Sequence, residues 1–117
     1  MLRKRFGHNF RKANNLPTIV VNKYLYQGDG ISIMRGTDWG NRYKIGEDGN
    51  REEVVRKFAN DLRHDPRLIS QVLRELRHQV LICCCKPLDC HGDVLADLAN
   101  WDWNTDGDFW INSKWFL

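Results

Sequence analysis

Segment 83–91 is the richest part of the chain in chemically reactive side chains and includes all four cysteines. Cys90 and His91 are adjacent and come directly before a stretch of apolar residues with helical spacing. At the start of a helix, unpaired N–H groups and the positive end of the helix dipole favour a thiolate. A thiol there is expected to have a lowered pKa and to be a better nucleophile or metal ligand. Cys90 and His91 are therefore the candidate catalytic residues.

Three interpretations of this segment are open. In the first, the strand cysteines are small buried hydrophobic side chains, and Cys90 and His91 only shape a turn. In the second, Cys90 and His91 line a ligand-binding or catalytic pocket. In the third, Cys83 or Cys85 joins them to bind zinc. Zinc sites usually combine two separated half-clusters, and here all donors lie in one short stretch. We expect no bound metal and no cofactor.

The cysteines are not spaced like a disulfide framework. Neighbouring residues of one strand point to opposite faces and pair poorly with each other. The basic N-terminus is not followed by the apolar stretch of a secretory signal, and no apolar run approaches the length that spans a bilayer. These features indicate free thiols in a reducing compartment. We expect no membrane association and a cytoplasmic location, in the host cytoplasm if the protein is viral.

A second group of residues suited to binding an anion lies in loop 35–42. Arg35 and Arg42 can hold a phosphate or a carboxylate. Trp39 can stack on a base, and Asn41 can hydrogen-bond a base edge or a sugar. In the alternative interpretation, the loop is structural and Trp39 fills the core. Together with residues beside Cys90, the candidate ligand-binding set is Arg35, Gly36, Trp39, Gly40, Asn41, Lys86 and Gly92.

The elements that must position these residues alternate between strands and helices. Strands are predicted at 18–22, 31–34 and 80–85, with a short one at 43–45, and helices at 51–63, at 66–77 and from Asp89 or Cys90 onward. Segment 80–85 is apolar on both faces, as in an interior strand of a parallel sheet. The pattern predicts a small, single-domain α/β fold, a three-layer sandwich with a mostly parallel sheet and helices on its faces.

Charge is segregated along the chain. Residues 1–28 carry a net charge of +6 and residues 89–117 a net charge of −5, within a total of +3. We expect residues 1–16 to be a mobile basic arm and residues 17–117 to be one domain with an aromatic C-terminal extension. The arm could contact acidic parts of the fold or the phosphates of a nucleic acid. The aromatic extension could fold back over the sheet or form a homodimer face.

Two sequence blocks carry a resemblance to a known family. The first reads R-G-T-D-W-G-N at 35–41 and continues as K-I-G-E-D-G-N-R-E-E-V at 44–54, and the second reads C-K-P-L-D-C-H-G at 85–92. Over residues 18–101 the chain resembles a small phage and bacterial family of unknown function that has an R-G-x-x-W-G-N block and a C-K-P-x-x-C-H-G signature. It is more distantly similar to another uncharacterised α/β family, which has C-H-R at a helix start and suspected connections to nucleotides or nucleic acids.

The chain departs from the first family at two positions. Cys84 stands where that family typically has an aromatic residue, and Arg42 where it often has proline. Neither change affects Cys90 or His91. The resemblance implies the fold and the location of the site, but it does not imply a reaction.

The sequence favours a small phage-type protein that binds a nucleotide or a nucleotide-like anion. The pocket is expected between loop 35–41 and the helix start at Cys90 and His91, and whether chemistry occurs there is left open. One alternative is a nucleic-acid-associated accessory protein that uses the basic arm. The other is a module that binds a host protein without catalysis, through the aromatic extension.

Overall fold

Three parallel strands form the sheet of the computed structural model, which describes residues 10–116. The strands are β1 (Ile19–Asn22), β2 (Ile31–Ser32) and β3 (Val80–Cys83), in the order β1-β3-β2. In the register of the sheet, Leu81 lies between Val20 of β1 and Ile31 of β2. The predicted interior position of the 80–85 segment is therefore confirmed, with the regular strand ending at Cys83.

The rest of the described chain combines helical segments with loops. The helical segments are α2 (Arg51–Arg63), α3 (Pro66–Gln71), the π-helix η1 (Val72–Leu76), α4 (His91–Asn100), α5 (Phe109–Asn112) and the 3₁₀-helix η2 (Lys114–Phe116). Residues 10–13 are also helical.

Side-chain capping explains where α2 and α3 begin. The Asn50 side chain accepts the Glu53 N–H at 2.9 Å, and the Glu53 carboxylate accepts the Asn50 N–H at 2.9 Å, so α2 starts in a capping box. Asp65 caps α3 by a side-chain bond alone, accepting the Leu68 N–H at 3.1 Å. Both starts are as predicted. The predicted helix 66–77 is divided, because its second half is wound as a π-helix.

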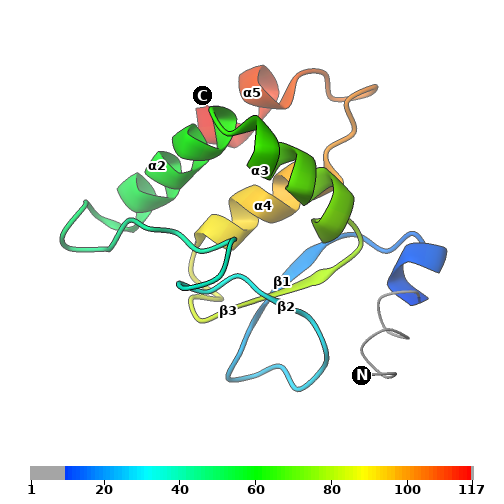
Figure 1. Ribbon diagram of the computed structural model, residues 1–117, viewed down its shortest axis with the longest axis horizontal. Helices are drawn as coiled ribbons and strands as arrows, with labels where there is room; N and C mark the ends of the chain where they lie inside the picture. The colour runs from blue at the N-terminus through cyan, green and yellow to red at the C-terminus, as the bar shows by residue number, and fades with distance from the viewer. Residues whose placement is uncertain (1–9, 117) are drawn as a thin grey trace.

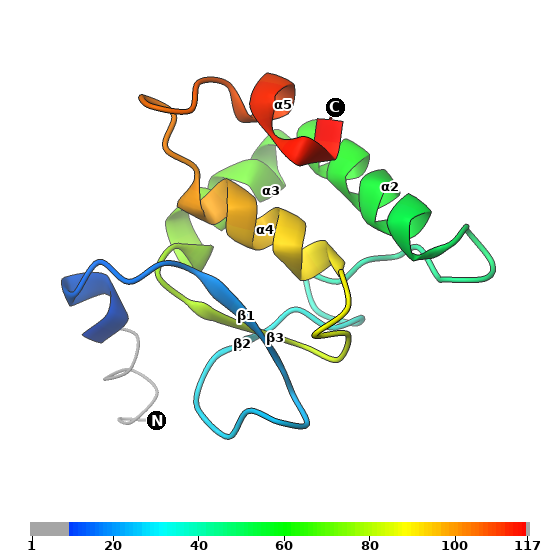
Figure 2. The ribbon, with the colours of Figure 1, turned by 180° about the vertical axis from the view of Figure 1, so that it is seen from behind.

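The helices α2, α3 and α4 lie together on one side of the sheet, and α4 is the nearest to the strands (Figures 1 and 2). The α/β class and the parallel sheet are confirmed. The helical layer covers one face, whereas the sequence favoured helices on both. The β1–β2 connection, 23–30, is shorter than the dozen or so residues of a helical crossover. It crosses the other face as a loop, where a Cβ on Gly30 would lie 3.0 Å from Ile82 Cδ1.

The predicted strand at 43–45 is absent, because side chains bind the backbone donors there. The Tyr43 N–H donates to Asn41 Oδ1 at 3.0 Å, and the Lys44 N–H donates to Asp48 Oδ2 at 2.8 Å. Strand β2 is also shorter than predicted, although Ile33 continues its ladder by donating to the Ile82 carbonyl at 3.0 Å. Segment 33–50 is therefore an irregular loop that leads from the sheet to α2.

The aromatic C-terminal extension folds back onto the helical layer. Phe109 is fully buried, with its ring centroid 5.2 Å from that of Trp101 and 5.0 Å from that of Trp110. The indole N–H of Trp115 donates to Asp97 Oδ2 of α4 at 2.8 Å. Figure 1 shows this red segment beside α2. The expectation that the extension folds back is met by packing on helices rather than on the sheet.

Part of the basic arm lies outside the described residues, which begin at Phe10. Within the described part, Arg11 Nε donates to the carbonyl of His78 at 2.9 Å, which ties this segment to the turn before β3. Among residues 10–116, no helix is long and apolar enough to cross a membrane.

Candidate functional site

The two predicted site loops lie side by side at the carboxyl edge of the sheet. Strands β2 and β3 are parallel neighbours, so loops 33–41 and 84–90 leave the sheet at the same edge. The ring of His91 links them, because its Nε2 lies 2.7 Å from the carbonyl oxygen of Ile33. The same ring packs edge-on against Phe58 of α2, with centroids 5.0 Å apart. His91 thus joins β2, α2 and the start of α4.

Burial sets the protonation of His91. It lowers the pKa of the imidazole, against the opposing effect of the Ile33 and Trp39 carbonyl groups and of Asp93. The ring is therefore neutral at neutral pH and donates one N–H to Ile33. In this arrangement His91 positions the loop that follows β2.

Gly92 allows α4 to approach the sheet closely. A Cβ at this position would lie 2.5 Å from Ile33 Cδ1 and 3.1 Å from Val20 Cγ1. Both values are closer than side chains normally pack. Gly92 was predicted to permit the approach of a ligand or of another backbone, and the neighbours found here are side chains of the sheet.

Cys90 is the N-cap of α4 and faces the last residue of β3. Its Sγ lies 3.4 Å from Cys83 Sγ, and both residues are only 2% exposed. The hydrogen bond from Cys90 lowers the pKa of Cys83, and the backbone N–H groups of Cys85 and Lys86 add to this effect. The expected lowering for Cys90 is wrong: its hydrogen bond with Cys83, burial and the nearby Asp93 carboxylate raise its pKa.

Two predicted ligand-binding residues are engaged by the protein itself. The ammonium group of Lys86 is paired with the carboxylate of Asp93, which also accepts the Cys90 N–H at 3.0 Å. The amide of Asn41 donates to the Val54 carbonyl at 3.1 Å and is buried. Lys86 thus fixes the start of α4, and Asn41 holds its loop against α2.

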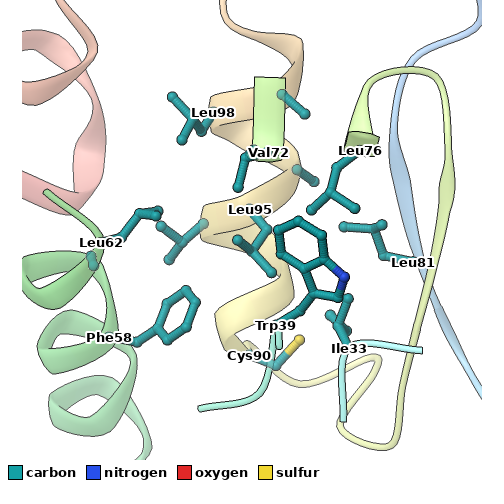
Figure 3. Packing of buried hydrophobic residues seen from close by; sticks show 14 of the residues in the cluster. Ile33, Trp39, Phe58, Leu62, Val72, Leu76, Leu81, Cys90, Leu95 and Leu98 are labelled. Carbon is teal, nitrogen blue, oxygen red and sulfur yellow. The ribbon is translucent and has the colours of Figure 1, made fainter. Parts of the chain in front are cut away.

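Trp39 takes the alternative role considered for it. It is 8% exposed and belongs to the hydrophobic core. Figure 3 shows its indole ring between Leu95 of α4 and Ile33. Gly36, with φ of +96°, and Gly40, where a Cβ would lie 2.9 Å from the Met34 carbonyl, shape the tight turn that carries Trp39 inward.

A pocket of about 430 Å³, hereafter the arginine pocket, lies between this loop, the start of α2 and the segment after β3. Its lining residues are Arg35, Asn41, Tyr43, Lys44, Ile45, Glu47, Arg51, Val54, Val55, Cys85, Asp89 and Cys90. Three predicted site residues, Arg35, Asn41 and Cys90, are thus brought to one pocket. Arg51 and Lys44 were missed, although both belong to the block at 44–54 that carried the family resemblance.

Three basic side chains (Arg35, Lys44 and Arg51) and two acidic side chains (Glu47 and Asp89) line the arginine pocket. Arg51 Nη1 donates to the backbone carbonyl of Asp89 at 3.0 Å, so its charge is not neutralised by that contact. Lys44 lies 3.9 Å from Glu47, at the limit of an ion pair. Arg35 forms neither a hydrogen bond nor an ion pair with any residue in the described range. The pocket therefore has guanidinium groups that can receive an anion.

The cysteines, histidines and acids do not assemble into a metal site in the part of the chain described here. Among residues 10–116, no group of three or more of these side chains is arranged to hold a metal ion. Cys84 is exposed, and Cys85, whose pKa is raised by burial, lies at the pocket wall.

Comparison with known proteins finds a family model and a curated relative. A family model described as a domain of unknown function (DUF4326) matches residues 20–101. The chain is also 40% identical over 85 residues to an uncharacterised 12.4 kDa protein in the nrdA-td intergenic region of Enterobacteria phage T4. That similarity covers 69% of this chain and 76% of the phage protein. No solved structure matches.

Proposed function

The chain belongs to the DUF4326 family of domains of unknown function, and we propose that this member binds a nucleotide or a nucleotide-like anion in the arginine pocket. The observation that carries the proposal is the meeting of Arg35 and Arg51 in one pocket, with no carboxylate ion pair at either guanidinium group in the described residues. A guanidinium group can bind phosphate oxygens through two parallel hydrogen bonds.

The position and the walls of the pocket support this ligand class. It opens beyond the carboxyl ends of parallel strands, where α/β proteins usually bind their ligands. Its volume lies within the range of small-molecule sites. Tyr43, Ile45 and Val54 provide apolar surface for a base or a sugar, while the arginines suit the phosphates.

The proposal is one of binding, without a catalytic step. Cys90 is almost fully buried, and the Nε2 of His91 is occupied by the carbonyl of Ile33. Neither group is therefore positioned to attack a ligand of nucleotide size in the pocket. A nucleotide is a cytoplasmic metabolite, so we place the protein's action in the host cytoplasm.

Titration calorimetry with adenosine diphosphate, pyrophosphate and adenosine tests the proposal. We expect the diphosphate to bind, pyrophosphate to bind more weakly and adenosine weakest of all. Arg35→Ala and Arg51→Ala should each cost about 1.5–3 kcal/mol of binding free energy, because each removes a charge-assisted hydrogen bond. Arg56→Ala, an exposed change on α2 outside the pocket, is the matched control and should leave binding unchanged.

Other outcomes favour the alternative functions. If the two pocket variants bind as the wild type does, the arginine pocket is not the site. Binding of a DNA oligonucleotide with steep salt dependence, lost in an Arg11→Ala/Lys12→Ala variant, would then favour the nucleic-acid-associated protein. If no nucleotide or oligonucleotide binds, the host-protein interaction module is favoured.

A further inference from the structure

The pair formed by Cys83 and Cys90 is a chemical feature that the proposed ligand does not use. The two sulfur atoms are 3.4 Å apart, yet they belong to different elements, the end of β3 and the start of α4. Other small side chains could fill this space about as well as two thiols do. Two thiols, however, can be joined by a covalent bond, and the sulfur atoms need only approach from 3.4 Å to about 2.05 Å to form a disulfide.

We infer that Cys83 and Cys90 are a redox-active pair that hydrogen peroxide converts into an intramolecular disulfide. The two remaining cysteines are placed differently. Cys84 points away from the core and is exposed, and Cys85 lies further along the loop, at the wall of the arginine pocket.

The surroundings of the pair favour its reaction. The hydrogen bond from Cys90, the backbone N–H groups of Cys85 and Lys86 and, least of these, the Lys86 ammonium group stabilise negative charge on the Cys83 sulfur. Cys90 lines the open arginine pocket, so a molecule as small as peroxide has a route to the buried sulfurs. The loop between the two cysteines is short, and the bond therefore forms within one chain.

The reaction balances without any further reagent. One sulfur of the pair attacks a peroxide oxygen, the O–O bond breaks, and the displaced hydroxide takes up a proton and leaves as water. The second sulfur then attacks the resulting sulfenic acid, and its proton leaves with the displaced hydroxide as a second water. Two thiols are oxidised to a disulfide, and both peroxide oxygens are reduced.

The Cys84→Ala/Cys85→Ala variant, in which the pair supplies the only thiols, gives the sharpest test. After peroxide treatment and unfolding, we expect its titratable thiols to fall from two to none, while the chain stays monomeric in non-reducing electrophoresis. Its mass should fall by that of two hydrogen atoms. Dithiothreitol should restore both thiols.

The wild-type chain provides a second measurement that does not depend on a variant's folding. Its thiols should fall from four to two, and cleavage before Asp89 should leave the strand and helix peptides joined by a disulfide at Cys83 and Cys90. The matched control is Cys83→Ala/Cys90→Ala, in which peroxide should oxidise exposed Cys84, showing that the oxidant is active. Retention of both thiols in the first variant, covalent dimers, or a bond from Cys84 or Cys85 to Cys90 in the wild type would overturn the inference.

Discussion

His91 and Gly92 are neighbouring residues with complementary effects at the start of α4. The ring of His91 draws the loop after β2 toward the helix through the Ile33 carbonyl. The missing side chain of Gly92 lets the same helix rest on Ile33 and Val20. The edge of the arginine pocket depends on both, because Arg35 follows the segment that they hold.

Gly92→Ala should destabilise the fold. The added methyl group would be forced against Ile33 and Val20, and overpacking of this kind costs about 1–3 kcal/mol. Denaturant unfolding measures the change. Ser70→Ala, on the exposed side of α3, should shift stability little, and equal stability of wild type and Gly92→Ala would contradict the packing described.

Stability should decrease as the pH falls below the ordinary pKa of histidine, 6.5. Burial lowers the folded-state pKa of His91, so the unfolded chain binds more protons than the folded chain in this window. The free energy of unfolding therefore falls as the pH decreases. Unfolding free energies at about pH 7.5 and pH 5.5 measure the effect. His91→Gln should be less stable overall, with a smaller difference between the two pH values. In His64→Gln, a change at an exposed histidine, the wild-type difference should persist; an unchanged difference in His91→Gln would contradict this assignment.

The sequence predicted which residues meet, but not how they are used. Parallel neighbouring strands bring Arg35 and Cys90 to one edge, and that follows from topology alone. Whether a loop side chain points inward depends on backbone turns that spacing does not reveal, so Trp39 and Asn41 became parts of the fold. The raised pKa of Cys90 depends on the contact with Cys83, which only the tertiary structure shows.

At the level of elements, α2 carries one wall of the arginine pocket. Its first residue is Arg51, and its start is fixed by the capping box of Asn50 and Glu53. The orientation of Arg51 therefore depends on a local motif that could be recognised in the sequence.

Asn50→Ala should lower stability by about 1 kcal/mol, the usual effect of losing an N-cap. Because the first turn of α2 would fray, the mobility of Arg51 should increase as well. Thermal unfolding and the amide exchange rates of residues 51–54 measure the two effects. Asn60→Ala, on the exposed side of the same helix, serves as control, and a stability loss no larger than that of Asn60→Ala would contradict the role of the cap.

Elements with strong local signals were predicted well. The apolar stripe and the N-cap correctly predicted the bounds of α2. The two apolar faces of segment 80–85 correctly predicted that β3 is the interior strand. The π-helix Val72–Leu76 was not foreseen, because its apolar spacing is close to that of an α-helix. The absent strand at 43–45 shows that a segment with β-propensity also needs a partner strand. Here the backbone N–H groups of Tyr43 and Lys44 donate to the side chains of Asn41 and Asp48 instead.

On the scale of the whole molecule, the aromatic extension is part of the single core. The family match ends at residue 101, and the chain beyond it contacts α2 through η2 and α4 through the Trp115 hydrogen bond to Asp97. Phe109 lies among Trp101, Trp110 and Phe116. The extension therefore stabilises the helical layer that carries Arg51.

Phe109→Ala should destabilise the protein by about 3–5 kcal/mol, as expected for removing a fully buried ring. Ile111→Ala is the matched control on the same short helix, because Ile111 is 64% exposed, and it should have little effect. Chemical unfolding compares the two variants. Similar small losses would mean that the extension does not pack on the domain in solution.

The binding of an anion by the arginine pocket is tested most directly by residue-resolved NMR. Backbone amide signals of the ¹⁵N-labelled full chain are followed during titration with adenosine diphosphate. We expect saturable shifts concentrated in residues 35–47, 51–55 and 85–90, which form the pocket, and their loss in Arg35→Ala/Arg51→Ala. Shifts confined to the basic segment 10–16, or no shifts at concentrations that saturate ordinary nucleotide sites, would contradict binding in this pocket.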